Sequence, residues 1–323
     1  MKTISELPNL PELLGRTRGA ATRRNNESWE SARDKRDRAI ARSPFVTDED
    51  REAFRIMDGL NDGLRACLAT NQRANKILID GLWRGLRDIQ RSDKRLQFAL
   101  VTIIDQRLQT SDQSTVLRLK PMSDAARKIL SSMSGDFIAS SEIQTFCNRR
   151  HIEGGLVVSP HVHAIVFGEG VLEQGKDKAA AWNTVIPCGK DGCAPVDVRP
   201  LPKWPDVANA LIYPLKAPNR MKTDYVHPRT GKRNIHQSEK GDRYIRFLRQ
   251  YQLLTMLQRD RMIFSGGDGA AVRRMALKLV HEHLDALTAP CSRAENMEWV
   301  REFWEEFLPR IGCDRFKMPV IEV

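Results

Sequence analysis

The sequence predicts an α+β protein in which a central antiparallel β-sheet is flanked along the chain by helical regions. Three segments rich in β-branched and apolar residues, 97–104, 137–147 and 156–167, predict strands. Apolar residues spaced three to four apart before and after these segments predict amphipathic helices. We expect a basic arm, a helical region, a sheet domain and a basic, helical C-terminal region over residues 1–46, 47–95, 96–220 and 221–323.

The first 95 residues are expected to contain an arm followed by helices. Residues 1–46 have many Arg and Asn residues and few periodic apolar positions, which predicts a mobile or loosely helical arm. Thr47 followed by three acidic residues is typical of a helix start. From Phe54 to Ile89 the apolar residues have helical spacing, which leaves open one long helix or two shorter ones.

The central segment is expected to alternate strands with short helices. Ser123 is expected to cap a helix that ends at Met133, just before the second strand. The second and third strands are expected to form an antiparallel hairpin, because residues 148–155 predict a turn. Residues 196–201 predict a fourth strand, and residues 204–212 predict a short helix.

The C-terminal region predicts helices over residues 244–264, 269–287 and 295–308. His281 and His283 repeat a His-x-His pattern inside the second of these helices. Helical residues two apart diverge by about 200°. We therefore expect these two side chains to be exposed to solvent rather than to bind one metal ion.

The chain is basic, with 52 Lys and Arg residues, 41 Asp and Glu residues and a net charge of +11. Residues 16–42 hold nine basic and four acidic residues, and residues 216–249 hold ten and three. A charge excess of this sign fits a polyanionic partner such as nucleic acid.

The sequence also sets expectations about the cellular setting. It contains no run of 18 apolar residues and no apolar signal-peptide core, so we expect no membrane association and a cytoplasmic location. The six cysteines form no disulfide framework, and Cys188 and Cys193 favour a glycine-rich hairpin over a metal site.

Residues 160–168 read Pro-His-Val-His-Ala-Ile-Val-Phe-Gly and contain two of the seven histidines. Side chains alternate between the faces of a strand, so His161 and His163 point to the same side. Two imidazoles on one face suit a divalent metal ion if a third ligand comes from a neighbouring strand. Taken alone, such a pair is more often a set of polar residues on a half-solvated face.

Glu142 is the candidate third ligand. The predicted hairpin places it opposite residues 161–163, and it is the only charged residue in an otherwise uncharged strand. A lone carboxylate in the middle of a strand is costly unless it is paired or coordinated. A carboxylate together with two imidazoles suits Mg²⁺ or Mn²⁺.

Tyr213 and Lys216 are the candidate catalytic residues. The chain has only four tyrosines, and helical spacing puts these two side chains on one face. A phenol can attack a phosphodiester when a metal ion polarises the phosphoryl oxygens. Pro214 disfavours helical geometry at Tyr213, so we expect a kink or a helix end there. The alternative is that Tyr213 only packs and Lys216 is solvated.

The order of these parts resembles that of the HUH endonucleases, in particular the rolling-circle replication initiator (Rep) proteins. The first motif of that family is a strand similar to Phe98–Thr102, the second is similar to His161–His163 and the third to Tyr213–Lys216. The resemblance covers about residues 96–220. It implies that the sheet domain is an RRM-like HUH nuclease domain.

The resemblance also implies a chemistry. Glu142, His161 and His163 would hold Mg²⁺ or Mn²⁺, Tyr213 would form a 5′-phosphotyrosine with single-stranded DNA, and Lys216 would orient the phosphate or the phenol. Such an enzyme nicks and rejoins origin DNA to initiate rolling-circle replication of a plasmid or phage, with a host helicase or polymerase as a further partner. The residues expected to contact single-stranded or duplex origin DNA are Arg220, Lys222, Arg229, Lys232 and Arg233.

Other functions remain open at this point. An HUH transposase or relaxase would use the same chemistry on a different DNA substrate. A non-catalytic DNA-binding protein would not depend on Tyr213. Histidine-triad nucleotide hydrolases need a third histidine at the position of Ile165, which argues against that class.

Overall fold

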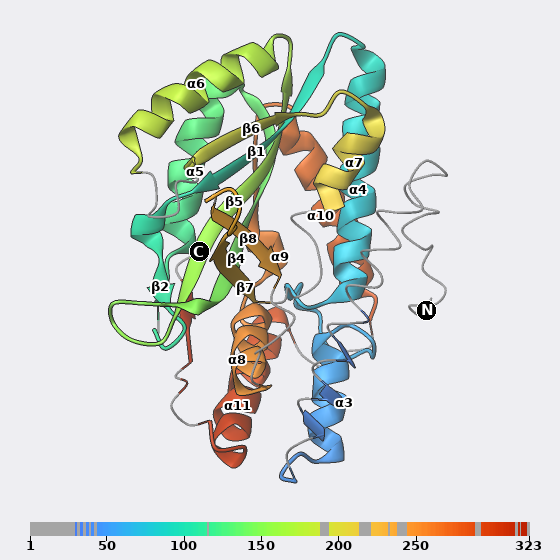
Figure 1. Ribbon diagram of the computed structural model, residues 1–323. Helices are drawn as coiled ribbons and strands as arrows, with labels where there is room; N and C mark the ends of the chain where they lie inside the picture. Colours follow the sequence, from blue (N-terminus) through green and yellow to red (C-terminus); the bar gives the residue numbers. More distant parts are fainter. Residues whose placement is uncertain are drawn as a thin grey trace.

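The computed structural model has an α+β fold built on a curled, mixed central sheet (Figure 1). It describes residues 30, 33, 34, 37, 38, 40, 41, 44–114, 116–187, 194–212, 221–231, 233–237, 244–287, 292–313, 316 and 318–321.

Eight strands form the central sheet, in the order β6-β1-β5-β4-β7-β8, with β2 beside β5 and β9 beside β4. Within the described residues, neighbouring strands of this sheet run antiparallel except for β4 and β7, which meet at Phe146 and Lys222. The sheet is therefore mixed rather than purely antiparallel as expected. Its strands are β1 (Gln97–Ile104), β2 (Thr110–Ser111), β4 (Asp136–Arg150), β5 (Leu156–Gly168), β6 (Val196–Pro200), β7 (Lys222–Val226), β8 (Arg233–Gln237) and β9 (Ile263–Gly266).

Helices cover the two faces of the sheet differently (Figure 1). The helices α5 (Leu119–Met133) and α6 (Val171–Val185) pack on the face that carries Val101 and Val162. The opposite face, which carries Ile165, is covered by α4 (Gln72–Ser92), α7 (Trp204–Ile212) and α10 (Gly269–Asp285). The period-two alternation of the strands produces this division, because odd and even residues enter different cores.

A second group of helices lies at one end of the molecule (Figure 1). It contains α3 (Asp48–Met57), α8 (Tyr244–Thr255) and α11 (Arg293–Arg310), which pack around Phe54 and Trp304. Short elements complete the fold: η2 (Gln106–Leu108), α9 (Arg259–Met262), and a two-stranded parallel sheet of β3 (Val116–Leu117) and β10 (Val320–Ile321).

Several expected elements are confirmed. The first strand and the short helix before Tyr213 have the expected bounds, and the predicted hairpin is formed by β4 and β5. The periodic segment after Thr47 is two helices, α3 and α4, and the side chain of Thr47 accepts a hydrogen bond from Asp50 N.

Other expectations about the elements were wrong. Ser123 does not cap its helix, because α5 begins at Leu119 and the Ser123 hydroxyl donates to Leu119 O. The helix expected over residues 244–264 stops at Thr255, and residues 263–266 form β9, because the edge of β4 accepts them as an antiparallel neighbour. The helix α6 and the β7–β8 hairpin were not predicted from the sequence.

The sheet extends beyond the segment 96–220 that was expected to contain it. Strands β7, β8 and β9 come from later in the chain, and α10 packs directly on α4. The expected division into domains stays a prediction. Among the described residues, no helix combines the length and apolar character needed to cross a membrane.

Candidate metal centre

The pairing of β4 with β5 builds the centre of the site. Glu142 lies directly opposite His161, as the predicted hairpin required, and Ser140 lies opposite His163. On its other side β5 pairs with β1, so His163 also lies opposite Thr102. The two histidines are thus held on a central strand that has hydrogen-bonded neighbours on both sides.

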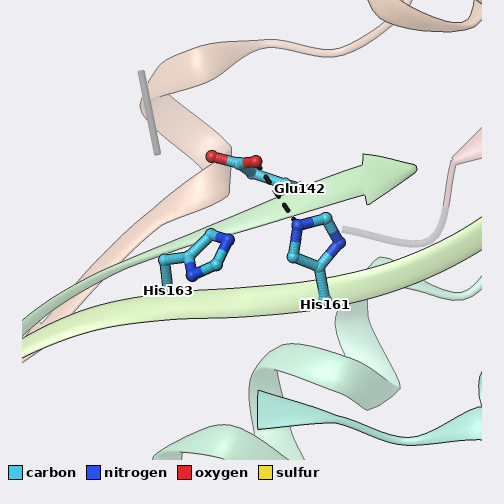
Figure 2. Close-up of side chains that lie close together, drawn as sticks. All are labelled: Glu142, His161 and His163. Carbon is cyan, nitrogen blue, oxygen red and sulfur yellow. Dashed lines mark ion pairs between the residues drawn. The ribbon is translucent and has the colours of Figure 1, made fainter. Parts of the chain in front are cut away.

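The side chains of Glu142, His161 and His163 converge on one point above the sheet (Figure 2). One ligand atom from each lies within 4.8 Å of the others, and Glu142 Oε2 is 3.4 Å from His161 Nε2. The two rings are nearly perpendicular, with centroids 4.9 Å apart. All three residues are buried, with at most 8% of their surface exposed. This group could hold a metal ion.

Hydrogen bonds at the far ring nitrogens orient both imidazoles. His161 Nδ1 lies 3.3 Å from the carbonyl oxygen of Ser159, and His163 Nδ1 lies 3.0 Å from Thr102 Oγ1. A carbonyl oxygen only accepts, so Nδ1 of His161 must carry the proton of that bond. In neutral His161 the lone pair is then on Nε2, the atom beside Glu142. Metal-binding histidines are typically held in this way by their second nitrogen.

The arrangement of the ring nitrogen of His161 and the carboxylate of Glu142 favours a cation between them. A neutral Nε2 presents a lone pair to the Glu142 carboxylate, and two electron-rich atoms at this distance repel unless a proton or a metal ion lies between them. Two imidazole nitrogens and a carboxylate oxygen form a mixed ligand set that suits divalent transition metals and Mn²⁺.

The buried Arg259 interacts electrostatically with the carboxylate of Glu142. The Arg259 guanidinium donates to Asn75 Oδ1 at 3.0 Å and is only 4% exposed. Burial lowers the pKa of Arg259, and the nearby negative charge of Glu142 partly opposes that shift. Since the arginine already offsets the charge of Glu142, a bound divalent ion would leave the centre positive and attractive to phosphate.

The centre opens into a cavity of about 820 Å³. Thr102, His161 and His163 form part of its floor, while Asn209 of α7 and Lys222 of β7 contribute to its walls. The cavity lies at this end of the sheet because the same face is apolar at its other end, where α4, α7 and α10 cover it. One continuous face therefore changes from a packed core to an open polar site.

Most of the other predicted site residues lie outside the described part of the chain. Tyr213 and Lys216 lie outside the described residues, as do Arg220 and Lys232, and the side chain of Arg233 is not described either. The helix α7 is described as far as Ile212, and its residues Asp206, Asn209 and Ala210 line the cavity.

The remaining candidates are described. Lys222 lines the cavity, and Arg229 is exposed in the turn between β7 and β8. His281 and His283 are half-buried rather than exposed as expected, because α10 packs against the rest of the protein. His281 Nε2 lies 3.4 Å from Asp260 Oδ2. Cys188 and Cys193 lie outside the described residues.

Three residues near the centre were not predicted from the sequence: Thr102, Ser159 and Arg259. Thr102 and Ser159 lie on the histidine face of their strands, which strand alternation could have revealed once the pairing of β1 with β5 was known. No local sequence pattern marks Arg259, which comes from a distant part of the chain. No family model, curated protein or solved structure matches this chain.

Proposed function

We propose that this protein is a metal-dependent enzyme that nicks and rejoins single-stranded DNA through a phosphotyrosine intermediate. The observation that carries the proposal is the convergence of Glu142, His161 and His163 beside a cavity that the two histidines and α7 line. Tyr213 directly follows α7 in the sequence, and Asn209 and Ala210 of that helix line the cavity.

The proposed reaction uses the residues of the cavity in distinct roles. Mg²⁺ or Mn²⁺ bound by the two histidines and Glu142 would polarise the oxygens of the scissile phosphate. The phenol oxygen of Tyr213 attacks the phosphorus, and the bond from phosphorus to the 3′ oxygen breaks. The phenol proton is lost to solvent, the leaving 3′ oxygen gains one, and Lys216 steadies the negative charge. The 5′ end stays on Tyr213, and attack by a 3′-hydroxyl reverses the reaction.

The basic hairpin at the cavity supports a phosphodiester substrate. Lys222 lines the cavity and begins the β7–β8 hairpin within the basic segment 216–249. Arg149 and Arg199 also line the cavity, and they form ion pairs with Asp224 and Asp197. Basic side chains at a groove contact DNA phosphates and make binding sensitive to salt. We assign Arg229, exposed on the same hairpin, to the outer part of this contact, with Arg220, Lys232 and Arg233 as further candidates from the sequence.

The test is the formation of a covalent adduct. Labelled single-stranded DNA pools are incubated with the protein and Mn²⁺, and the products are separated by denaturing electrophoresis. We expect a protein–DNA band that disappears with EDTA and in Tyr213→Phe, and that weakens at least 100-fold in His161→Ala. Tyr225→Phe is the matched control, because Tyr225 is an exposed tyrosine on β7. No adduct in the wild type, or an unchanged adduct in Tyr213→Phe, contradicts the proposal.

The biological setting is a further step of the same proposal. A rolling-circle replication initiator would cleave one strand of a plasmid or phage origin and leave a 3′-hydroxyl that a polymerase extends. A transposase or relaxase would form the same adduct on a transposon end or a transfer origin. Cleavage of plasmid, phage and transposon DNA libraries, followed by mapping of the nicked sites, distinguishes them.

A further inference from the structure

The cavity contains a second polar feature beside the metal centre. Two residues further along the same strands, Gln144 lies opposite Ser159, and both line the cavity. Gln109 reaches the same place from the loop after η2, and its Nε2 donates to Ser159 Oγ at 3.3 Å. We name Gln109, Ser159 and Gln144 the amide row. It lies about 6.6 Å along the strands from the pair Glu142 and His161, which is the length of two strand residues.

The amide row is joined to the metal centre by hydrogen bonds. The hydroxyl of Ser159 accepts from Gln109, and the carbonyl oxygen of Ser159 accepts from His161 Nδ1. A group bound at the amide row would therefore lie beside a group bound at the metal centre. Since the separation is close to that between the phosphate and the base of one nucleotide, a single nucleotide could reach both.

The chemistry of the amide row suits a neutral, hydrogen-bonding ligand. A glutamine side chain has two donor hydrogens and an acceptor oxygen, and it carries no charge. One donor hydrogen of Gln109 is used by Ser159 Oγ, and Gln144 Nε2 donates to Thr145 O at 3.2 Å. Phosphate groups are recognised mainly by cations, whereas the edges of bases are read by donors and acceptors placed together. The amide of Asn209 lines the same cavity from the helix side.

A planar, positively charged guanidinium also lines this cavity. Arg149 and Phe146 both line the cavity, and the Arg149 guanidinium lies 4.4 Å from the centroid of the Phe146 ring. Asp224 fixes this guanidinium, with Oδ2 at 3.0 Å from Nε and 2.8 Å from Nη2. Arginine planes and aromatic rings are the surfaces on which unpaired bases stack. Arg149 is thus held in one orientation before any ligand binds.

We propose that the amide row and the Arg149 plane form a pocket for one nucleobase of single-stranded DNA, next to the phosphate at the metal centre. This inference rests on the proposed function for its choice of substrate. The cavity volume of about 820 Å³ is large enough for a nucleotide. The pocket would select the base beside the cleaved bond and so contribute to the choice of cleavage site.

The experiment measures base preference in binding, which does not require cleavage. Tyr213→Phe protein saturated with Mn²⁺ is mixed with a random-sequence pool of single-stranded DNA, and the bound strands are sequenced. We expect one position with a strong preference, and an abasic site at that position should weaken binding. Adding Gln109→Leu or Gln144→Leu should reduce the preference about fivefold or more. The matched control is Gln174→Leu, because Gln174 is exposed on α6 behind the sheet.

Each result decides the inference separately from the proposed function. Gln109 lies in a loop and is half-buried, so Gln109→Leu decides the matter if Gln144→Leu does not fold. The inference is overturned if the parent protein shows no base preference, or if Gln109→Leu keeps that preference in full. A missing covalent adduct in the wild type counts against the phosphotyrosine reaction, whereas a missing base preference counts against the pocket.

Discussion

Replacement of Thr102 by valine tests how the metal centre is organised. Thr102 Oγ1 lies 3.0 Å from His163 Nδ1, and Thr102 is half-buried on β1 between β5 and β6. Valine keeps the branched shape that suits a strand but lacks the hydroxyl. Loss of such an outer hydrogen bond to a metal-binding histidine typically lowers metal affinity by about 10- to 100-fold. This corresponds to about 1.4 to 2.8 kcal/mol of binding free energy.

Isothermal titration with Mn²⁺ measures the affinity of the wild type, Thr102→Val and Thr102→Ser. Serine restores the hydroxyl, so we expect Thr102→Ser to bind close to the wild-type affinity. Urea unfolding without metal checks that the three proteins have similar free energies of unfolding. Under that condition, a change in affinity reports the orientation of His163 rather than a change in the fold.

Two results would refute this reasoning. Wild-type affinity in Thr102→Val would mean that the hydroxyl does not orient His163. Equal weakening in Thr102→Val and Thr102→Ser, at unchanged stability, would mean that the side-chain shape rather than the hydrogen bond matters. Failure of the wild type to bind any divalent ion would remove the metal centre itself.

Three further predictions concern packing, pH and thiol reactivity. Gly81→Ala should lower the free energy of unfolding by about 1 to 3 kcal/mol in urea titrations, because a Cβ at this position would lie 2.7 Å from the backbone of α10. The control Gly135→Ala should have little effect, because its Cβ would have no neighbour within 4 Å. Burial and then the charge of Arg73 lower the pKa of His283. The stability that neutral His283 contributes is therefore present above its pKa in the unfolded chain and is lost as the pH falls through its pKa in the folded protein. Urea unfolding at pH 7.5 and pH 5.5 should show that the free energy of unfolding falls less between these pH values in His283→Gln than in the wild type. Burial raises the pKa of Cys67 to about 12, so mass spectrometry after brief alkylation at pH 8 should find Cys147 labelled and Cys67 intact.

The three residues of the candidate metal centre were predictable because much of the required information is local. The two histidines are one residue apart in a strand, and Glu142 and His161 belong to one hairpin whose turn is short. Side-chain alternation assigns the residues to a face. The register at the turn does not carry through to the site, because the pairing shifts between Thr145 and Arg150, and this shift brings Glu142 opposite His161. Glu142 was also conspicuous as a carboxylate in an uncharged strand.

The supporting residues were not predictable because they depend on long-range contacts. Thr102 reaches His163 only because β1 pairs with β5, and Arg259 approaches Glu142 from more than 100 residues away in the chain. The same limit explains the error at residues 263–266. Their local pattern continues a helix, but the open edge of β4 offers hydrogen bonds that stabilise a strand instead.

The sequence by itself determined that the protein has a strand hairpin with two histidines and a glutamate on one face, within a basic α+β chain. Only the tertiary structure decided that this face is closed at one end by α4, α7 and α10 and open at the other as a cavity. The physical reason is that alternation assigns side chains to a face, whereas the packing of distant helices decides which part of that face excludes water. The metal centre and the amide row lie where the helices leave the sheet uncovered.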